Sequence, residues 1–340
     1  PIYRDRADVP LPDKAFRFSF CVLVVEAILE NKVVEVFRES SPNSVRSNRP
    51  LLTAIADENC QASATLCIKP IELDRQLLIG KIIKIEVSNP ETNEPEILRI
   101  ELNFFNSMVD EKLDRKAGGL QGSGSSYLCT LCYATRETAV SEVGTFNISR
   151  TLADTQKLAN ELLQNPDQVP TENKGVKTTP LLLTEPRKRA LDATHADINL
   201  GQFFKKIIVR ETAQLTVWEA RKDVKHLLDN AEAKYDSHIK KSLGINPNKQ
   251  QFPGNTARAM FAEENSDVIL ATIPETERKE NLKRVLSLFR DLRSVYRAHK
   301  PLDDLPILTH SFKEKAVEMG RILKTEFEYA QWPNYLHKVQ

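Results

Sequence analysis

Apolar and polar side chains alternate through the first third of the chain. Phenylalanine and valine occupy every second position between residues 15 and 25, and this period of two predicts a β-strand. Strands are expected at 15–25, 32–37, 51–56, 82–87 and 97–105. Short polar turns at 30–32 and 88–94 join neighbouring strands. One stretch in this part, 61–78, favours a helix, although Pro70 interrupts it.

The pattern changes after Asp110, where apolar residues begin to recur at helical spacing. Helices are expected after residue 149, twice within 197–244, at 275–298 and at 311–328. Ser149 and Ser311 are expected to cap two of them, because a serine hydroxyl accepts from the free amides of a first turn. Gly244 is expected to end the second long helix. The segment 165–180, rich in Pro, Asn, Thr and Lys, is expected to be a linker or an exposed loop.

The composition is ordinary for a soluble globular protein, with 340 residues, 41% of them hydrophobic and 28% charged. This length suits two domains, or one domain with a large insertion. No apolar run approaches the ~20 residues that span a bilayer. No secretory signal pattern opens the chain, and Pro1 is not expected to be a natural start.

Cysteine usage and charge narrow the picture further. Five cysteines with one close pair favour a reducing compartment over a disulfide framework. The net charge of +1 does not predict nucleic-acid binding, because such proteins are usually more basic. Local basic faces on a mixed surface are still compatible with it.

Cys129 and Cys132 stand in a C-x-x-C spacing after a glycine-rich approach. Their sulfurs can face one point, and two thiolates are half of a tetrahedral zinc site. A redox pair and two ordinary thiols remain alternatives, since this spacing serves both metal and redox chemistry. The sequence has no second C-x-x-C, so further ligands are sought among its six histidines, of which His337 is a candidate. If a C-x-x-C closed by two spaced histidines applies, the second histidine falls beyond Gln340 and the chain is cut short.

Asp57 and Glu58 follow the apolar run 51–56, which we interpret as a buried strand. Strand ends open onto clefts in α/β sheets, so a carboxylate at this point is a candidate catalytic residue. Phosphodiester chemistry uses acidic ligands for Mg²⁺, and one aspartate is not enough to hold two ions. The alternative is that these residues begin a loop or cap the next helix.

Basic residues cluster on the predicted helices, most clearly on 275–298. Lys283, Arg290 and Arg297 recur every seven residues and share a face with Arg293. Such a face is either solvated and interspersed with acids, or positioned to contact phosphates. The same helix carries an apolar stripe spaced as a core face: Leu282, Leu286, Phe289, Leu292 and Tyr296.

Several stretches together resemble one protein family. They are Met108–Leu113, Gly124–Arg136, Asp192–Ile198, Gly254–Arg258 and Asn334–Lys338, with further similarity at Val9–Phe20 and Ala56–Glu58. In this order they are similar to the catalytic core of the V(D)J recombination-activating protein 1 family, which includes invertebrate transposon relatives and the Transib transposases. The resemblance covers nearly the whole chain and is therefore more specific than any single motif.

The resemblance implies an α/β fold in which a ribonuclease-H-like mixed sheet is interrupted by a large, mostly helical zinc-binding insertion. The catalytic core is expected at 1–110 and the insertion at 111–340. An Asp-Asp-Glu triad is implied, with Asp57 as its second aspartate. The family's first aspartate lies in an Asp-Gly segment, and no Asp-Gly occurs in this sequence. The glutamate is expected past Gln340, so the isolated chain is expected to be inactive.

The resemblance also implies roles for individual residues. Cys129, Cys132 and His337 are implied zinc ligands, with the fourth missing from the chain. His195 matches a position near the active site, where an imidazole contacts the scissile phosphate; a packing histidine is the alternative. The implied DNA contacts are Arg258, Arg293, Tyr296 and Arg297, although a core position fits Tyr296 equally well.

The expected activity is that of a D-D-E DNA recombinase or transposase. Such an Mg²⁺- or Mn²⁺-dependent endonuclease nicks DNA at recombination signals or terminal inverted repeats and transfers strands. The expected partners are double-stranded DNA, a second copy in a homodimer and a kelch-type subunit, with no membrane and a nuclear location. A different class is a catalytically dead, domesticated, zinc-stabilised DNA-binding or interaction module. A third is a redox protein that forms a labile disulfide between Cys129 and Cys132 and holds no tight zinc.

Overall fold

The computed structural model divides the chain into two compact units, each described by itself. Unit 1 comprises residues 1–105 and 180–183, and unit 2 comprises 106–179 and 184–340, where a single boundary at 110 was expected. The structure describes residues 15–22, 24–29, 32–39, 49–55, 61–104, 107–108, 110–122, 124–144, 147–167, 172–215, 224–247, 254–297 and 306–339. Asp57 and Glu58 lie outside these residues.

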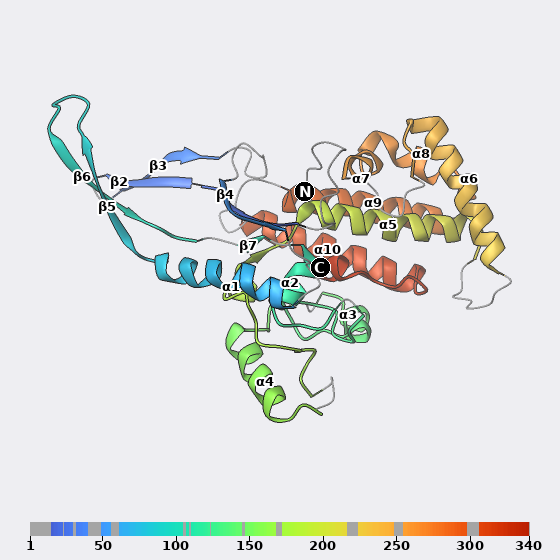
Figure 1. Ribbon diagram of the computed structural model, residues 1–340. Coiled ribbons are helices and arrows are strands. Elements are labelled where there is room, and N and C mark those ends of the chain that lie inside the picture. Colours follow the sequence, from blue (N-terminus) through green and yellow to red (C-terminus); the bar gives the residue numbers. More distant parts are fainter. Residues whose placement is uncertain are drawn as a thin grey trace, which may run out of the picture. The chain divides into compact units, whose positions relative to one another are not determined.

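The described strands of unit 1 pair two by two, all antiparallel. The pairs are β1 (Ala15–Phe20) with β4 (Arg49–Ile55), β2 (Val24–Leu29) with β3 (Lys32–Arg38), and β5 (Ile82–Ser88) with β6 (Pro95–Glu101). The single strand expected at 15–25 is therefore two strands with different partners. Leu29 lies opposite Lys32, which confirms the expected tight pairing around the 30–32 turn. Figure 1 shows β5 and β6 as a long hairpin.

Helix α1 (Gln61–Leu78) is continuous through Pro70, so the predicted helix is confirmed. Its Glu72 carboxylate accepts from the Leu183 amide at 2.8 Å and pairs with Arg75 at 2.8 Å. Gln76 donates to the Leu183 carbonyl at 3.2 Å, which ties the segment 180–183 to this helix. Several apolar side chains on the strands of unit 1 are exposed to solvent, including Ile28 at 76%. Main-chain pairing therefore defines these hairpins more than burial does.

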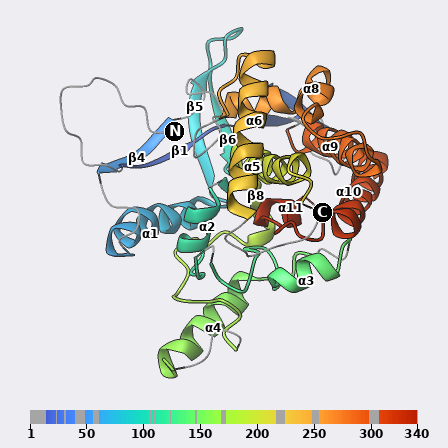
Figure 2. The ribbon, with the colours of Figure 1, turned by 90° about the vertical axis from the view of Figure 1, so that its right-hand side faces the viewer.

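Unit 2 is mostly helical (Figures 1 and 2). Its helices are α2 (Glu111–Ala117), α3 (Arg136–Ser141), α4 (Leu152–Gln164), α5 (Ala193–Thr212), α6 (Lys225–Leu243), α7 (Gly254–Met260), α8 (Ser266–Leu270), α9 (Glu277–Tyr296), α10 (Pro306–Glu326) and α11 (Asn334–Lys338). Short 3-10 turns lie at Pro186–Lys188 and Glu263–Asn265. The two-residue strands β7 (Ser107–Met108) and β8 (Arg189–Ala190) pair in parallel just before α5.

The core of unit 2 is formed by buried residues of α5 to α11, and α9 packs along α10. The rings of Phe204, Phe261 and Phe289 pack together, with centroids 4.6–6.0 Å apart. Leu282, Leu286, Phe289 and Leu292 are fully buried, which confirms the apolar stripe predicted for this helix. None of the helices in the described parts of the chain is long and apolar enough to cross a membrane.

Two of the predicted helix starts are wrong. Thr151, not Ser149, caps α4, and its hydroxyl accepts from the Asp154 amide at 3.0 Å. Ser311 lies inside α10, which begins five residues earlier, so a serine before an apolar run was not a start signal here. Gly244 does end α6, with a φ of +66° that suits glycine.

Candidate metal centre and polar clusters

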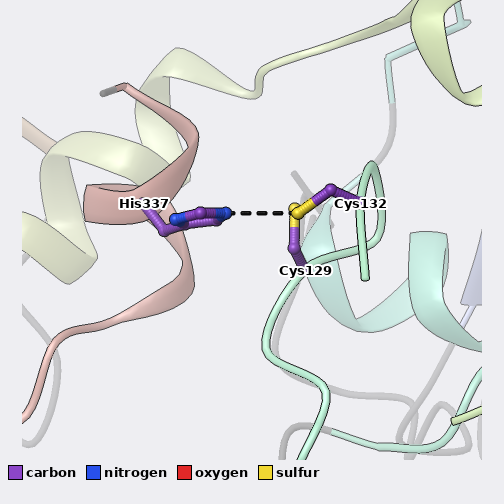
Figure 3. Close-up of side chains that lie close together, drawn as sticks. All are labelled: Cys129, Cys132 and His337. Carbon is purple, nitrogen blue, oxygen red and sulfur yellow. Dashed lines mark hydrogen bonds between the residues drawn. The ribbon is translucent and has the colours of Figure 1, made fainter. Parts of the chain in front are cut away.

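Three predicted ligands converge in unit 2 (Figure 3). The Sγ atoms of Cys129 and Cys132 and a ring nitrogen of His337 all lie within 4.8 Å of one another, and all three residues are buried. Cys132 Sγ lies 3.2 Å from His337 Nε2. The cysteines come from a loop and the histidine from α11, which is separated from that loop by some two hundred residues of sequence.

The cysteine loop is closed by main-chain hydrogen bonds. Tyr127 bridges to Thr135, and the Leu128 amide donates to the Ala134 carbonyl at 2.9 Å. Inside the loop, the Leu131 amide points at Cys129 Sγ and the Ala134 amide at Cys132 Sγ, each at 3.3 Å. Amide donors aimed at sulfur stabilise a thiolate over a thiol.

The electrostatics of the pair favour one negative charge. Burial by itself raises the pKa of the Cys129 thiol, but hydrogen bonds from Cys132 and His337, with Lys338 nearby, outweigh it and set that pKa well below its usual range. The hydrogen bond to Cys129, together with burial, raises the pKa of Cys132. A cation bound between the sulfurs would favour ionisation of both thiols. Two thiolates and an imidazole are the donor set that suits Zn²⁺.

His195 stands at the start of α5, beside the helix cap. Asp192 accepts from the Thr194 amide at 2.9 Å and the His195 amide at 3.1 Å, and its other oxygen lies 2.7 Å from His195 Nδ1. This hydrogen bond raises the pKa of His195 despite partial burial. The imidazole is 49% exposed, so it is a surface ion-pair partner rather than a packed core residue.

Three of the residues predicted to contact DNA meet at one buried carboxylate. Asp197, on α5, is fully buried and accepts from Arg293 at 2.9 and 3.0 Å. Tyr296 Oη donates to it at 2.7 Å, and Arg297 binds it at 2.6–2.8 Å. Burial next to Asp197 raises the pKa of Tyr296, so the phenol remains a donor. Arg293 and Arg297 of the predicted basic face are thus held against α5, whereas Lys283 pairs with Asp267.

The remaining predicted site residues, Arg258 and Asp57, belong to neither of these clusters as described. Arg258 is exposed on α7. Asp57, the predicted catalytic aspartate, lies outside the described residues. The sequence analysis did not identify Asp197 as a functional residue. Its only signal in the sequence is its position, two residues after His195 at the start of a predicted helix.

Three family models match the chain consecutively. The recombination-activation protein 1 (RAG1) RNase H domain matches residues 2–125, the ZnC2 domain 127–184 and the ZnH2 domain 189–340. The order is an RNase-H-like domain followed by zinc-binding domains. This agrees with the expected α/β class and with a helical second part.

Curated relatives agree with these models. The chain is 30% identical to V(D)J recombination-activating protein 1 of Sus scrofa over 340 residues, 29% to that of Xenopus laevis over 338 and 27% to that of Oncorhynchus mykiss over 339. These alignments cover 96–97% of the chain and 30–31% of the relatives, so the chain spans about a third of their length. Because three consecutive models and these relatives agree along the whole sequence, the chain belongs to the recombination-activating protein 1 family.

Proposed function

We propose that this chain is part of a D-D-E DNA recombinase or transposase, a metal-dependent endonuclease that nicks and rejoins DNA at recombination signals or terminal inverted repeats. The observation that carries the proposal is the unbroken succession of the three matched models, which begins with an RNase H domain. Folds of this class place carboxylates at strand ends, where phosphodiester chemistry needs them.

In the proposed reaction, a water oxygen attacks a phosphorus atom of the DNA and the bond to the 3′ oxygen breaks, which leaves a 3′-hydroxyl. That hydroxyl then attacks a second phosphodiester, forms a new P–O bond and releases another 3′ oxygen. No bond between protein and DNA forms. Asp57 would hold Mg²⁺ or Mn²⁺, which when bound stabilises the charge on the attacking and leaving oxygens. His195 would contact the scissile phosphate through its exposed imidazole.

The DNA contacts proposed are Arg258, Arg293, Tyr296 and Arg297. Arg258 is exposed on α7, where its guanidinium could reach a phosphate. Arg293 and Arg297 use one edge of each guanidinium on Asp197 and remain 19% and 25% exposed, so a phosphate would meet only their outer edges. Tyr296 is occupied by its hydrogen bond to Asp197 and would contribute only a ring edge.

Zinc is proposed to be structural, bound by Cys129, Cys132 and His337. The ligand geometry and the names of the two zinc-domain models support this assignment. Because the cysteines and the histidine are far apart in sequence, zinc bound there would link both ends of the helical region and add to folding stability.

The proposed assembly is a homodimer on double-stranded DNA, acting in the nucleus with a kelch-type subunit. The domain division proposed remains a catalytic core at 1–110 and a zinc-bearing insertion at 111–340. A second candidate function is a catalytically dead, zinc-stabilised DNA-binding or interaction module. It is supported by the Cys129–Cys132–His337 site, whose ligands converge independently of any catalytic carboxylate.

The test is metal-dependent nicking of a labelled terminal-repeat duplex by the full-length protein with its partner supplied. The wild type is compared with Asp57→Asn. We expect nicking by the wild type and none by the variant, with DNA binding retained. Equal nicking by both would remove Asp57 from the catalytic site, and no nicking by either would favour the non-catalytic module.

A further inference from the structure

Helix α2 contacts both halves of the Cys129–Cys132–His337 site. Glu111 lies in its first turn and Arg115 one turn later, and this i, i+4 spacing places the two side chains on one face. Both are buried, at 12% and 4% exposure, and they form an ion pair at 2.9 Å. Glu111 lies in the stretch Met108–Leu113, which resembles the family but was assigned no chemical role, and Arg115 lies two residues past it.

Glu111 holds both ends of the short helix that carries His337. One carboxylate oxygen accepts from Asn334 Nδ2 at 3.1 Å, at the first residue of α11. The other forms a buried ion pair with Lys338, the last residue of α11. Since α11 is only five residues long, fixing its two ends fixes the direction of the imidazole between them.

Arg115 holds the other half of the site. Its guanidinium donates to the Tyr127 carbonyl at 3.3 Å and to the Leu128 carbonyl. Leu128 precedes Cys129, so this contact places the first cysteine of the loop. A continuous set of charged contacts thus runs from Lys338 through Glu111 and Arg115 to the cysteine loop.

We propose that Glu111 and Arg115 are positioning residues for the metal, which hold His337 against the two thiols before the ion arrives. The proposal rests on the zinc-binding role proposed above. Burying a carboxylate is unfavourable unless charged partners offset it, and burial raises the pKa of Glu111 even beside Lys338 and Arg115. A pair of apolar side chains could join α2 to α11 and to the cysteine loop at a lower desolvation cost. Charged groups with directional hydrogen bonds, in contrast, fix the orientation of α11 and of the loop.

The test measures the zinc affinity of the full-length protein by competition with a chromogenic chelator. We expect the wild type to bind zinc at this site and Glu111→Gln to bind it about 10–100-fold more weakly, which is the usual loss when a residue that holds a metal ligand is changed. The matched control is Asp236→Asn, which breaks a similarly buried ion pair with Lys205 (2.8 Å; 7% and 11% exposed) between α5 and α6. The control is expected to lower the thermal midpoint and leave zinc affinity unchanged.

Three outcomes overturn parts of this scheme separately. Unchanged affinity in Glu111→Gln refutes the positioning role alone, and an equal loss in Asp236→Asn attributes the effect to general destabilisation. A wild type that binds no zinc refutes the proposed zinc site itself.

If Glu111→Gln does not fold, Asn334→Ala removes only the 3.1 Å contact at a half-buried position. It is expected to weaken Co²⁺ binding while leaving the tetrahedral absorption bands of the saturated protein intact. Unaltered Co²⁺ binding in this variant counts against the proposal.

Discussion

Two buried clusters in unit 2 are assembled from ionisable side chains that lie far apart in the sequence, and they are satisfied in opposite ways. At Asp197, one carboxylate receives two guanidinium groups and a phenol, so every oxygen has donors from the protein. At the cysteine site, two thiols and an imidazole share a few hydrogen bonds, and a single negative charge is favoured.

This difference in hydrogen-bond partners indicates which of the two clusters is suited to bind a ligand. A buried acid with enough protein donors is a structural joint, and Asp197 joins α5 to α9 in this way. Two cysteine sulfurs and an imidazole that converge are a donor set that suits Zn²⁺, which is why a metal is proposed for this cluster. Two arginines of the basic face suggested for DNA, Arg293 and Arg297, are therefore bound to Asp197 within the protein. The cysteine sulfurs, by contrast, lie together with a histidine nitrogen as metal ligands would.

The largest effect is expected from Cys129→Ser. Structural zinc in small domains contributes apparent binding energies of about 10–16 kcal/mol, and losing one thiolate removes much of it. The variant should contain no tightly bound zinc by atomic emission and should unfold at a lower temperature by calorimetry. Cys67→Ser, at another buried free cysteine, is the control and should keep its zinc. Full zinc content in Cys129→Ser would contradict the metal site.

A smaller effect on stability is expected at the Asp197 cluster, whose carboxylate is fully hydrogen-bonded by protein groups. Asp197→Asn leaves Arg293 and Arg297 without their carboxylate and should lower the free energy of unfolding by about 3–5 kcal/mol. Urea unfolding measures the loss, and zinc content should not change. Asp267→Asn breaks an exposed pair with Lys283 and should leave the midpoint in place. Equal midpoints for the two variants would refute the structural role of Asp197.

The smallest effect concerns pH. The hydrogen bond to Asp192 raises the pKa of His195. Burial by itself raises the pKa of Asp192, but hydrogen bonds from His195 and the Thr194 amide outweigh it and lower that pKa. Both groups are therefore charged in the folded state over a wide pH range. The histidine's contribution is fully present below about pH 6.5, its unfolded pKa, and is lost as pH rises through the raised value. The aspartate's contribution is present above about pH 4 and is lost as pH falls through the lowered value.

The measurement is an NMR titration of the His195 ring. In the wild type we expect a pKa above about 6.5, and in Asp192→Asn a lower value, because the carboxylate partner is gone. The control is Asp267→Asn, which removes an exposed carboxylate on α8 and should leave the His195 titration unchanged. A His195 titration that is the same in both proteins would show that the pair does not form in solution.

Local signals in the sequence were read correctly where they depend on neighbouring residues. The alternation at 32–37, the stripe along α9 and Gly244 after α6 all give the predicted elements, because each is decided within a few turns or strands. The caps failed at Ser149 and Ser311, since several residues near a helix start are able to cap it and packing selects among them.

By itself the sequence determined the chemistry available: a C-x-x-C pair, a distant histidine and a helix that is apolar on one side and basic on the other. Only the tertiary structure decided which of these groups meet. It brought His337 to the cysteines through Glu111 and Arg115, and it turned Arg293, Tyr296 and Arg297 onto Asp197. The physical reason is that buried charges are stable only beside partners, and such partners are set by packing between elements far apart in the chain.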